Sequence, residues 1–595
     1  MQNIKQRLDL LRYEMNHYNI DMYIVPSIDS HNSEYVPECF ERCSWISNFN
    51  GSAGEVLVTL EHAYLWTDGR YFLQAEKQLD DNHYTLMRQT GFIPETEQWI
   101  MENARGMRVG FDPKVISIGR ANQLKQIMAS VLGEAVTIDS NLIDNCKLKS
   151  GEVLNMPTSQ LFKLNNEYSG KSSAQKILEV QDILIKKEVD YLALNVLDEI
   201  AWLFNIRGRD IIFNPLVISY ALIGRDKSYL FIDSNKLSTA IKDEFNKNNI
   251  QILPYNQFGD FLAKLNGVVW LDDKTANYWM YVNANQNADI YLSRSPILFL
   301  KATKNDVEIS GMKTAHIKDA VAEINFLHWL DTNWRGGITE LDAAQQLGRF
   351  RQEQKNYIED SFATISGYQS NGAIIHYRVT PETNKTIKDD SLYLIDSGGQ
   401  YLEGTTDITR TIHLGNPTNE QKRHYTLVLK GHLALARAKF PHGTCGEHLD
   451  ILARQPLWDN YLNYRHGTGH GVGCFLCVHE GPQKISQAPS NIPLLPGMIV
   501  SNEPGLYIDN EYGIRIENLC LIKRSADNNS LYGPFYEFED LTLVPYNKRL
   551  ISVELLTEIE KQQIKNYYAR ISLLIRPLLQ PEIQKWLDDE LDLFY

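Results

Sequence analysis

The sequence predicts a protein of the α/β (α+β) class, and three observations predict it. The chain has 595 residues, which is too long for one core because cores stop growing beyond roughly 250–300 residues. An order of helix, buried strand, Trp-containing segment and strand pair occurs twice in the first half. The second half turns from helical to alternating strand patterns and ends helical. We therefore expect two related α/β domains, a larger mixed domain and a helical C-terminal extension.

The first copy of the repeated order opens the chain. Apolar residues recur at helical spacing over 3–20, and the apolar run 22–25 stops at Pro26, as expected for a helix followed by a buried strand. Two strand-like runs follow at 55–59 and 63–68.

The second copy returns at an offset of about 170 residues. A helical pattern starts at Ile177, and strand-like runs occupy 190–194, 216–223 and 227–233. The polar stretch 147–173 would join the two domains. Chance recurrence of a common α/β pattern is the alternative explanation.

Polar breaks and changes of pattern set the predicted boundaries. The polar segment 301–306 precedes a long helical pattern, and a second helix is expected over 340–354. Beyond about residue 544 the pattern becomes helical again. The predicted divisions are two α/β domains at 1–146 and 147–302, a mixed domain at 303–544 and the helical extension at 545–595.

The composition limits the classes of partner. Hydrophobic residues make up 43% and charged residues 22% of the chain, with a net charge of −15. Nucleic acid is not an expected partner, because phosphate binding needs a clustered basic face that the sequence lacks. No apolar run reaches the roughly 18 residues that span a membrane, so we expect a cytoplasmic protein. The seven scattered cysteines are read as reduced thiols.

Two aspartates follow strand-like segments in the third predicted domain. Asp396 ends the apolar run 392–395, and Asp407 begins an alternating segment after a glycine-containing turn. An antiparallel, hairpin-like return between these segments would bring both carboxylates to one place. A lone aspartate at a strand end is usually a turn residue or a cap. A functional role for the pair is therefore supported only by the further candidate ligands that follow in the sequence.

His470 lies in the glycine-rich phrase H-G-T-G-H-G-V-G at 466–473. The glycine density argues against a helix, so His466 and His470 are not the paired histidines of a helical zinc-protease motif. A nucleotide loop is also disfavoured, because no helix with a Lys-Ser/Thr pair follows. Instead, the glycines would let other backbone segments approach closely. The run 474–480 reads as a strand.

Two glutamates complete the set. Glu503 lies in N-E-P-G after the apolar run 498–500, and Glu517 lies in the alternating G-I-R-I-E-N at 513–518. In such a strand Arg515 and Glu517 share a face, which is often a surface ion pair. The apolar neighbours favour burial instead, where a charge needs a partner or a metal ion.

Together these residues predict a pair of metal ions. The candidate ligands are four carboxylates and one imidazole, at Asp396, Asp407, His470, Glu503 and Glu517. Hard oxygen ligands with a single histidine favour Mn²⁺, with Co²⁺, Zn²⁺ and Mg²⁺ as alternatives. Two ions about 3.5 Å apart lower the pKa of a bridging water and polarise a carbonyl, so hydrolysis is the expected chemistry. Substrate positioning and proton transfer are expected of His376, His466 and His479.

The phrases in this region resemble a known family. N-G-A-I-I-H-Y, Y-L-I-D-S-G, G-T-T-D-I-T-R-T, H-G-T-G-H-G-V-G, V-H-E-G-P, N-E-P-G and G-I-R-I-E-N occur in the order found in the pita-bread metallopeptidases. That group holds methionine aminopeptidase, prolidase and aminopeptidase P. The chain is most similar to the long, three-domain cytosolic aminopeptidase P type, and further matching phrases at 67–75, 214–221 and 315–322 extend the resemblance over most of its length.

The resemblance implies a fold, a reaction and residue roles. It implies two creatinase-like N-terminal domains, a pita-bread catalytic domain and a homodimer. Asp396 and Asp407 would bind one metal and His470 and Glu503 the other, with Asp407 and Glu517 bridging. The family releases an N-terminal residue from peptides whose second residue is Pro. Substrate contacts are implied for His376, His466 and His479, and for Arg70 in the first domain.

Two alternatives stay open. A prolidase cleaves only Xaa-Pro dipeptides, but the two N-terminal domains favour aminopeptidase P. A non-catalytic pita-bread module that binds peptides would have lost its metal ligands, whereas all five are present here. The departures from the family pattern are small: Leu506 follows N-E-P-G where Tyr is commoner, and Arg378 and Val379 follow H-Y where small residues or Pro are usual.

Overall fold

The chain forms two compact units in the computed structural model, which describes residues 3–91, 95–526 and 530–594. One unit comprises Met1–Asn165 and Lys171–Leu298, and the other comprises Asn166–Gly170 and Phe299–Tyr595. Residues 1 and 595, where the first and last predicted domains begin and end, lie outside the described residues.

The first unit opens with the predicted helix and strand. Helix α1 (Ile4–His17) is capped by Asn3, whose side chain accepts from the Gln6 amide, and it buries the apolar face that the spacing predicts. Strand β1 (Met22–Pro26) is buried along its whole length. It lies within a sheet of order β4 (Thr85–Arg88), β3 (Ala63–Thr67), β2 (Gly54–Thr59), β1, β5 (Arg108–Phe111) and β6 (Glu134–Thr137).

The second sheet of this unit repeats the first. Its order is β12 (Ile250–Leu253), β11 (Ser228–Phe231), β10 (Tyr220–Gly224), β8 (Tyr191–Leu194), β13 (Val268–Leu271) and β14 (Asp289–Leu292). Each neighbouring pair runs in the same relative direction as its counterpart: β1 pairs antiparallel with β2 and parallel with β5, and β8 pairs antiparallel with β10 and parallel with β13. The predicted pair of related α/β folds is confirmed, and chance recurrence is excluded.

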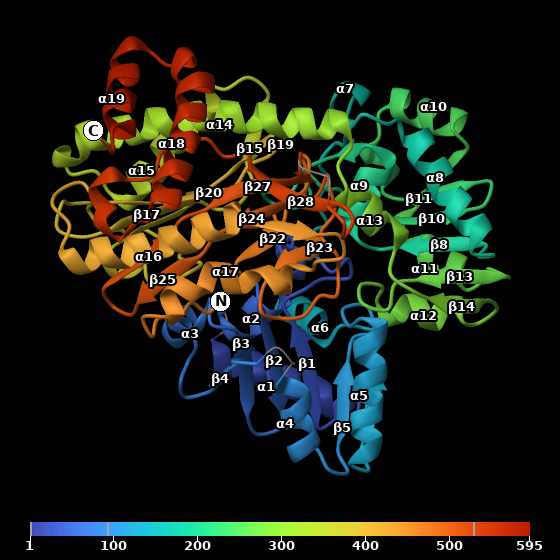
Figure 1. The fold of residues 1–595 in the computed structure, drawn as a ribbon. Coiled ribbons are helices and arrows are strands. Elements are labelled where there is room, and N and C mark those ends of the chain that lie inside the picture. The colour runs from blue at the N-terminus through green and yellow to red at the C-terminus, as the bar shows by residue number, and fades with distance from the viewer. Residues whose placement is uncertain (1–2, 92–94, 527–529, 595) are drawn as a thin grey trace. The chain divides into compact units, whose positions relative to one another are not determined.

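Helices flank both sheets of the first unit (Figure 1). Those with the first sheet are α1, α2 (Arg42–Ser47), α3 (Phe72–Gln78), α4 (Glu95–Asn103), α5 (Ile118–Ser130) and α6 (Leu142–Lys149). Those with the second are α8 (Ser173–Lys186), α9 (Leu197–Phe204), α10 (Thr239–Lys247), α11 (Phe258–Leu262) and α12 (Tyr278–Ala284). A short ladder joins β7 (Phe162–Lys163) to β9 (Ile206–Arg207), and α13 (Pro296–Ala302) spans the end of the unit.

Two pairs of helices pack in the second unit. The long helix α14 (Asp306–Asn333) starts at a capping box between Asn305 and Glu308 and packs against α15 (Glu340–Gln352). Helix α16 (Asn419–Ala436) packs against α17 (Gly446–Trp458). The short α7 (Asn166–Ser169) belongs to this unit and contacts α14.

The strands of the second unit form small antiparallel sheets. One has the order β16 (Ile365–Tyr368), β17 (Tyr393–Ser397), β20 (Ile408–Ile412), and another β15 (Tyr357–Asp360), β18 (Gly399–Tyr401), β19 (Gly404–Thr405). The largest has the order β21 (Lys439–Pro441), β28 (Phe535–Asp540), β27 (Asn518–Arg524), β24 (Ile499–Asn502), β22 (Gly469–Gly471), β23 (Glu480–Ile485), and β25 (Gly505–Ile508) pairs with β26 (Tyr512–Arg515).

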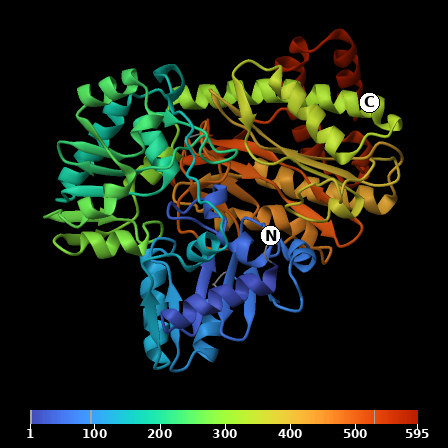
Figure 2. The same cartoon turned by 180° about the vertical axis from the view of Figure 1, so that it is seen from behind.

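The C-terminal segment is helical, as predicted. Helices α18 (Glu558–Leu574) and α19 (Pro581–Leu591) lie beside one end of α14 in both views of the ribbon (Figure 1 and Figure 2). Their buried residues join the core cluster that holds residues of β17, β20 and α16. The extension therefore shares a core with β17 and β20, the strands of the predicted phrases around Asp396 and Asp407. Within the described residues, no helix is both long and apolar enough to cross a membrane.

Candidate metal centre

Asp396 and Asp407 come from paired strands. Asp396 lies on β17 and Asp407 directly precedes β20. The two strands run antiparallel with Asp396 opposite Thr409, so the expected return of the chain is present, although β18 and β19 intervene. Both residues are buried, at 7% and 4% exposure.

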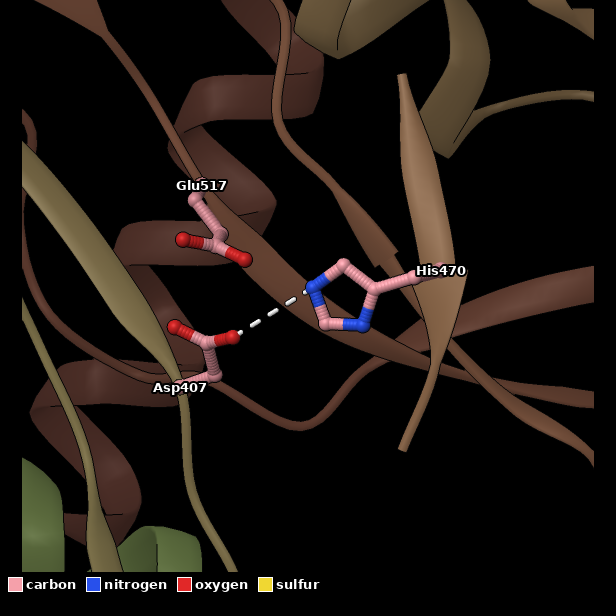
Figure 3. A group of neighbouring side chains, drawn as sticks. All are labelled: Asp407, His470 and Glu517. Carbon is pink, nitrogen blue, oxygen red and sulfur yellow. Dashed lines mark ion pairs between the residues drawn. The ribbon is translucent and has the colours of Figure 1, made fainter. Parts of the chain in front are cut away.

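Three of the predicted ligands converge (Figure 3). Ligand atoms of Asp407, His470 and Glu517 all lie within 4.8 Å of one another. His470 Nε2 is 3.5 Å from Asp407 Oδ2 and 3.4 Å from Glu503 Oε1. Each residue comes from a different strand or strand end, so residues that are far apart in the sequence share one place.

The backbone sets the tautomer of His470. Its Nδ1 lies 2.9 Å from the carbonyl oxygen of Gly471, to which it donates. A neutral imidazole then presents an unprotonated Nε2 to the carboxylates, which is the arrangement of a metal-binding histidine. The Ser501 hydroxyl accepts from the His470 amide and donates to Glu503 Oε1, which ties these two residues together.

Glycines at 469 and 471 permit this arrangement. A Cβ on Gly469 would lie 2.0 Å from the carbonyl oxygen of Ser501, and one on Gly471 would lie 2.3 Å from that of Glu480. Both distances are far inside a van der Waals contact. The close backbone approach that the glycine-rich phrase predicts is confirmed, and it brings β22 against its neighbours.

Arg515 pairs with Asp396 across the site. Its Nη2 lies 2.5 Å from Asp396 Oδ2, its Nε donates to Thr409 Oγ1, and its Nη1 donates to the Tyr507 hydroxyl. The sequence placed Arg515 beside Glu517 as a possible ion pair, but the guanidinium pairs with Asp396, and the Thr409 hydroxyl lies between Arg515 and Glu517. Glu517 Oε2 accepts from Thr409 Oγ1 at 2.8 Å.

The donor set fits a cation. Within the described residues, Asp396 Oδ1 and Glu517 Oε1 are buried without a hydrogen-bond donor. A buried carboxylate oxygen in that condition is expensive unless a proton or a metal ion satisfies it. Oxygen-rich donors with one imidazole suit Mn²⁺ and similar divalent ions.

The pKa shifts of the site residues also indicate that its buried carboxylates lack enough positive charge around them. Burial raises the pKa of Asp396 to about 7, although Arg515 opposes the rise. Burial and the charges of Asp407 and Glu503 raise the pKa of Glu517 well above its usual range. Burial lowers the pKa of His470, but the Asp407 and Glu503 carboxylates outweigh it and raise the pKa to about 9. Without a metal ion, the site therefore holds protons at neutral pH.

Two of the three further histidines border this cluster. His466 Nε2 is 2.9 Å from the Tyr507 hydroxyl, and its Nδ1 is 3.9 Å from Glu503 Oε2. The ring of His479 stands edge-on to that of His470, with centroids 4.4 Å apart. The strand expected over 474–480 is wrong: the segment is a bent loop up to His479, with Phe475 at φ 50°, and β23 starts only at Glu480.

His376 and Arg70 come from other parts of the chain. His376 is half buried in the turn that follows the 3₁₀ segment Gln369–Asn371. Arg70 belongs to the first unit, where its guanidinium forms a bidentate pair with Asp68 at 2.7 and 2.8 Å. The substrate-binding roles of both residues stay predictions.

Thr409 and Tyr507 were not among the candidates from the sequence. Thr409 donates to Glu517, and Tyr507 links His466 to Arg515. The only sequence signal for Thr409 is its place two residues after Asp407 in an alternating segment, because side chains two apart share a face of a strand.

Sequence profiles match nearly the whole chain. Residues 7–146 and 154–308 match the Creatinase/Prolidase N-terminal domain, in two related profiles. Residues 310–524 match Metallopeptidase family M24, and residues 534–592 match the C-terminal region of that peptidase.

Known proteins are similar to this chain over nearly its whole length. "Probable Xaa-Pro aminopeptidase P" of Neurospora crassa is 43% identical over 579 residues, covering 94% of this chain and 84% of the relative. "Xaa-Pro aminopeptidase 1" of Dictyostelium discoideum is 40% identical, covering 97% and 94%. A crystal structure of X-prolyl aminopeptidase from Caenorhabditis elegans, described as a cytosolic enzyme with a di-nuclear active site, superposes with a TM-score of 0.94 at 34% identity over both whole chains.

These matches confirm the predicted fold class, with two creatinase-like domains, a pita-bread domain and a helical C-terminal region. The chain therefore belongs to metallopeptidase family M24 and, within it, to the Xaa-Pro aminopeptidase P proteins.

Proposed function

We propose that this chain is a metal-dependent exopeptidase that hydrolyses the N-terminal Xaa-Pro bond of peptides. The observation that carries the proposal is the meeting of Asp407, His470 and Glu517 beside buried carboxylate oxygens without a donor. Relatives at about 40% identity are Xaa-Pro aminopeptidases, and they share nearly the full length of the chain.

Five residues are proposed as ligands of two divalent ions. Asp396 and Asp407 would hold one ion, and His470 and Glu503 the other, with Asp407 and Glu517 bridging. The single imidazole among carboxylates supports Mn²⁺, with Co²⁺ or Zn²⁺ as alternatives. When bound, two such ions supply Lewis-acid polarisation of the scissile carbonyl and activation of water.

The surrounding side chains supply orientation and proton transfer. Arg515 fixes Asp396 and Thr409 fixes Glu517, which sets the direction of each carboxylate. His466 and His479 are proposed to hold the substrate and to move protons near neutral pH. His376 is proposed as a further substrate contact. Arg70 of the first unit is proposed to bind substrate as well.

The substrate proposed is a peptide with Pro at its second position. A Pro nitrogen carries no hydrogen and its ring fixes the backbone, so a dedicated pocket is needed.

We propose the division 1–146, 147–302, 303–544 and 545–595 for the domains, and a cytoplasmic location like that of the nematode enzyme.

A homodimer is the proposed assembly. Ile451 and Trp458 lie seven positions apart on α17, so they share a helix face, and both expose a large apolar side chain. Tyr461, just beyond the helix, is fully exposed. Exposed apolar groups of this kind favour a protein interface. Sedimentation equilibrium of the purified protein tests this: a monomer at micromolar concentration contradicts it.

Cleavage of matched peptides tests the function. The purified protein is assayed on Xaa-Pro-Yaa and Xaa-Pro substrates, after chelation and after addition of Mn²⁺. We expect release of the first residue from the tripeptide, dependent on the metal. Cleavage of the dipeptide alone would indicate a prolidase. Inactivity with every divalent metal, despite binding of the peptide, would indicate a non-catalytic peptide-binding module.

A further inference from the structure

Arg410 is a buried residue that contacts the backbone on either side of the candidate metal centre, at Thr409 and Glu517. It lies on β20, three residues after Asp407, and is 2% exposed. Its guanidinium donates to main-chain carbonyls, to one amide oxygen and to one hydroxyl: Thr409 O, Glu517 O, Val544 O, Pro545 O, Asn518 Oδ1 and Tyr567 Oη. A buried guanidinium with this many fixed acceptors holds the segments that carry them at a set spacing.

Two of these acceptors belong to the segments of the metal-binding carboxylates. Arg410 Nη1 lies 2.9 Å from the carbonyl oxygen of Thr409 and 2.7 Å from that of Glu517. The Glu517 amide in turn donates to Thr409 O, and the Thr409 hydroxyl donates to the Glu517 carboxylate. Arg410 thus closes a small network around the backbone from which Glu517 projects.

The other side of the guanidinium contacts the C-terminal extension. Its Nη2 lies 2.7 Å from the carbonyl oxygen of Val544 and 3.2 Å from the Tyr567 hydroxyl. Tyr567 lies on α18, and its hydroxyl also contacts the carbonyl oxygens of Thr542 and Val544 and accepts from the Val544 amide. Its ring stacks on Tyr546, with centroids 5.1 Å apart. One buried hydroxyl therefore joins the extension to Arg410.

The helix that carries Tyr567 is held by an N-terminal capping box and by buried side chains. Thr557 and Glu560 form a capping box at its start, and Ile564, Tyr568 and Ile571 are buried beside Tyr567. A rigid helix in a shared core can transmit position to the strand that it contacts.

We propose that Arg410 and Tyr567 are positioning residues for Asp407 and Glu517, and that the C-terminal extension sets the geometry of the metal centre through them. The inference rests on the proposed function. Groups that orient metal ligands without touching the metal typically change metal affinity or activity by roughly 10–100-fold when removed. The Tyr567 hydroxyl lies beyond Arg410, so we expect an effect of about tenfold at that position.

A pair of adjacent tyrosines provides the test. Tyr567→Phe removes the hydroxyl on Arg410, whereas Tyr568→Phe removes a buried hydroxyl on the same helix that donates to the carbonyl oxygen of Tyr546 at 3.4 Å. Binding of Mn²⁺ to the full-length, metal-free protein is measured by calorimetry, with kcat, KM and the melting temperature for each variant. We expect Tyr567→Phe to weaken Mn²⁺ binding about tenfold and to lower kcat with little change in KM. Tyr568→Phe should lower only the melting temperature.

Arg410→Lys is the second variant. It keeps the charge and loses the planar fork, so we expect weaker Mn²⁺ binding than in Tyr567→Phe. The inference is overturned if the two tyrosine variants change metal binding equally. It is also overturned if both Tyr567→Phe and Arg410→Lys bind Mn²⁺ as the wild type does. Wild-type protein that neither binds Mn²⁺ nor cleaves peptide overturns the proposed function instead, and the inference with it.

Discussion

Replacing Glu517 with Gln separates two effects of its buried carboxylate. One is the loss of stability in the metal-free protein, and the other is the contribution to metal binding and turnover. The side chain is 1% exposed, and burial together with Asp407 and Glu503 raises its pKa well above the usual range. The unfolded chain has a carboxyl with a pKa near 4.3, so at pH 7 the raised pKa of the buried carboxyl counts against the metal-free fold. A difference of one pKa unit corresponds to about 1.4 kcal/mol.

Glu517→Gln should therefore raise the melting temperature of the metal-free protein at pH 7. Because the carboxyl is protonated in both states below its unfolded pKa, the gain should shrink toward pH 4. Added Mn²⁺ should reverse the order. A ligand at 100 times its dissociation constant stabilises by about 2.7 kcal/mol, and the variant should lose most of this together with turnover. Calorimetric melting with chelator and with Mn²⁺, at pH 7 and pH 4, measures both effects.

Glu480→Gln is the matched control. Glu480 is equally buried, but it pairs with Lys301 and Lys304, whose charges outweigh burial and lower its pKa. The same substitution there leaves two buried ammonium groups without their carboxylate, so it should destabilise the protein by roughly 3–5 kcal/mol at pH 7. If Glu517→Gln destabilises the metal-free protein as Glu480→Gln does, or retains Mn²⁺ stabilisation and turnover, the reasoning about the site is refuted.

Three further outcomes are expected. Asp407→Ala should abolish hydrolysis because it removes a proposed bridging ligand; near-normal turnover in a variant shown by metal analysis to hold two ions would contradict the two-metal assignment. His466→Ala and His479→Ala should lower kcat strongly with the metal content retained, whereas loss of metal in either variant would place that residue among the ligands. Since the pKa of His470 is about 9 in the metal-free site, metal must displace a proton from it at pH 7, so affinity for Mn²⁺ should rise with pH up to about 9. Calorimetry in buffers of different ionisation enthalpy counts the released protons, and zero release would contradict this.

The sequence predicted the parts of the molecule that depend on residue type and spacing. Apolar periodicity located α1 and β1, and the repeated order of elements predicted two related sheets, because helical and strand periods differ. Glycines at alternating positions predicted close backbone approach, since a Cβ at Gly469 would overlap a carbonyl. The run 474–480 was misread because its apolar residues are buried in a bent loop, and burial gives the same composition as a strand.

The partners of Arg515 and Arg410 could not be predicted, for a different reason. The R-x-E spacing suggested an ion pair between Arg515 and Glu517, yet Arg515 reaches Asp396 from a strand more than a hundred residues away in the chain. Arg410 binds mostly backbone carbonyls, which every residue has, so no residue type marks its targets. The alternation of polar and apolar residues predicts which face of a strand a carboxylate lies on. The contacts that hold the carboxylate there depend on tertiary packing. The groups proposed to position the ligands of the candidate metal centre therefore had to come from the fold, and removing the Tyr567 hydroxyl tests that proposal.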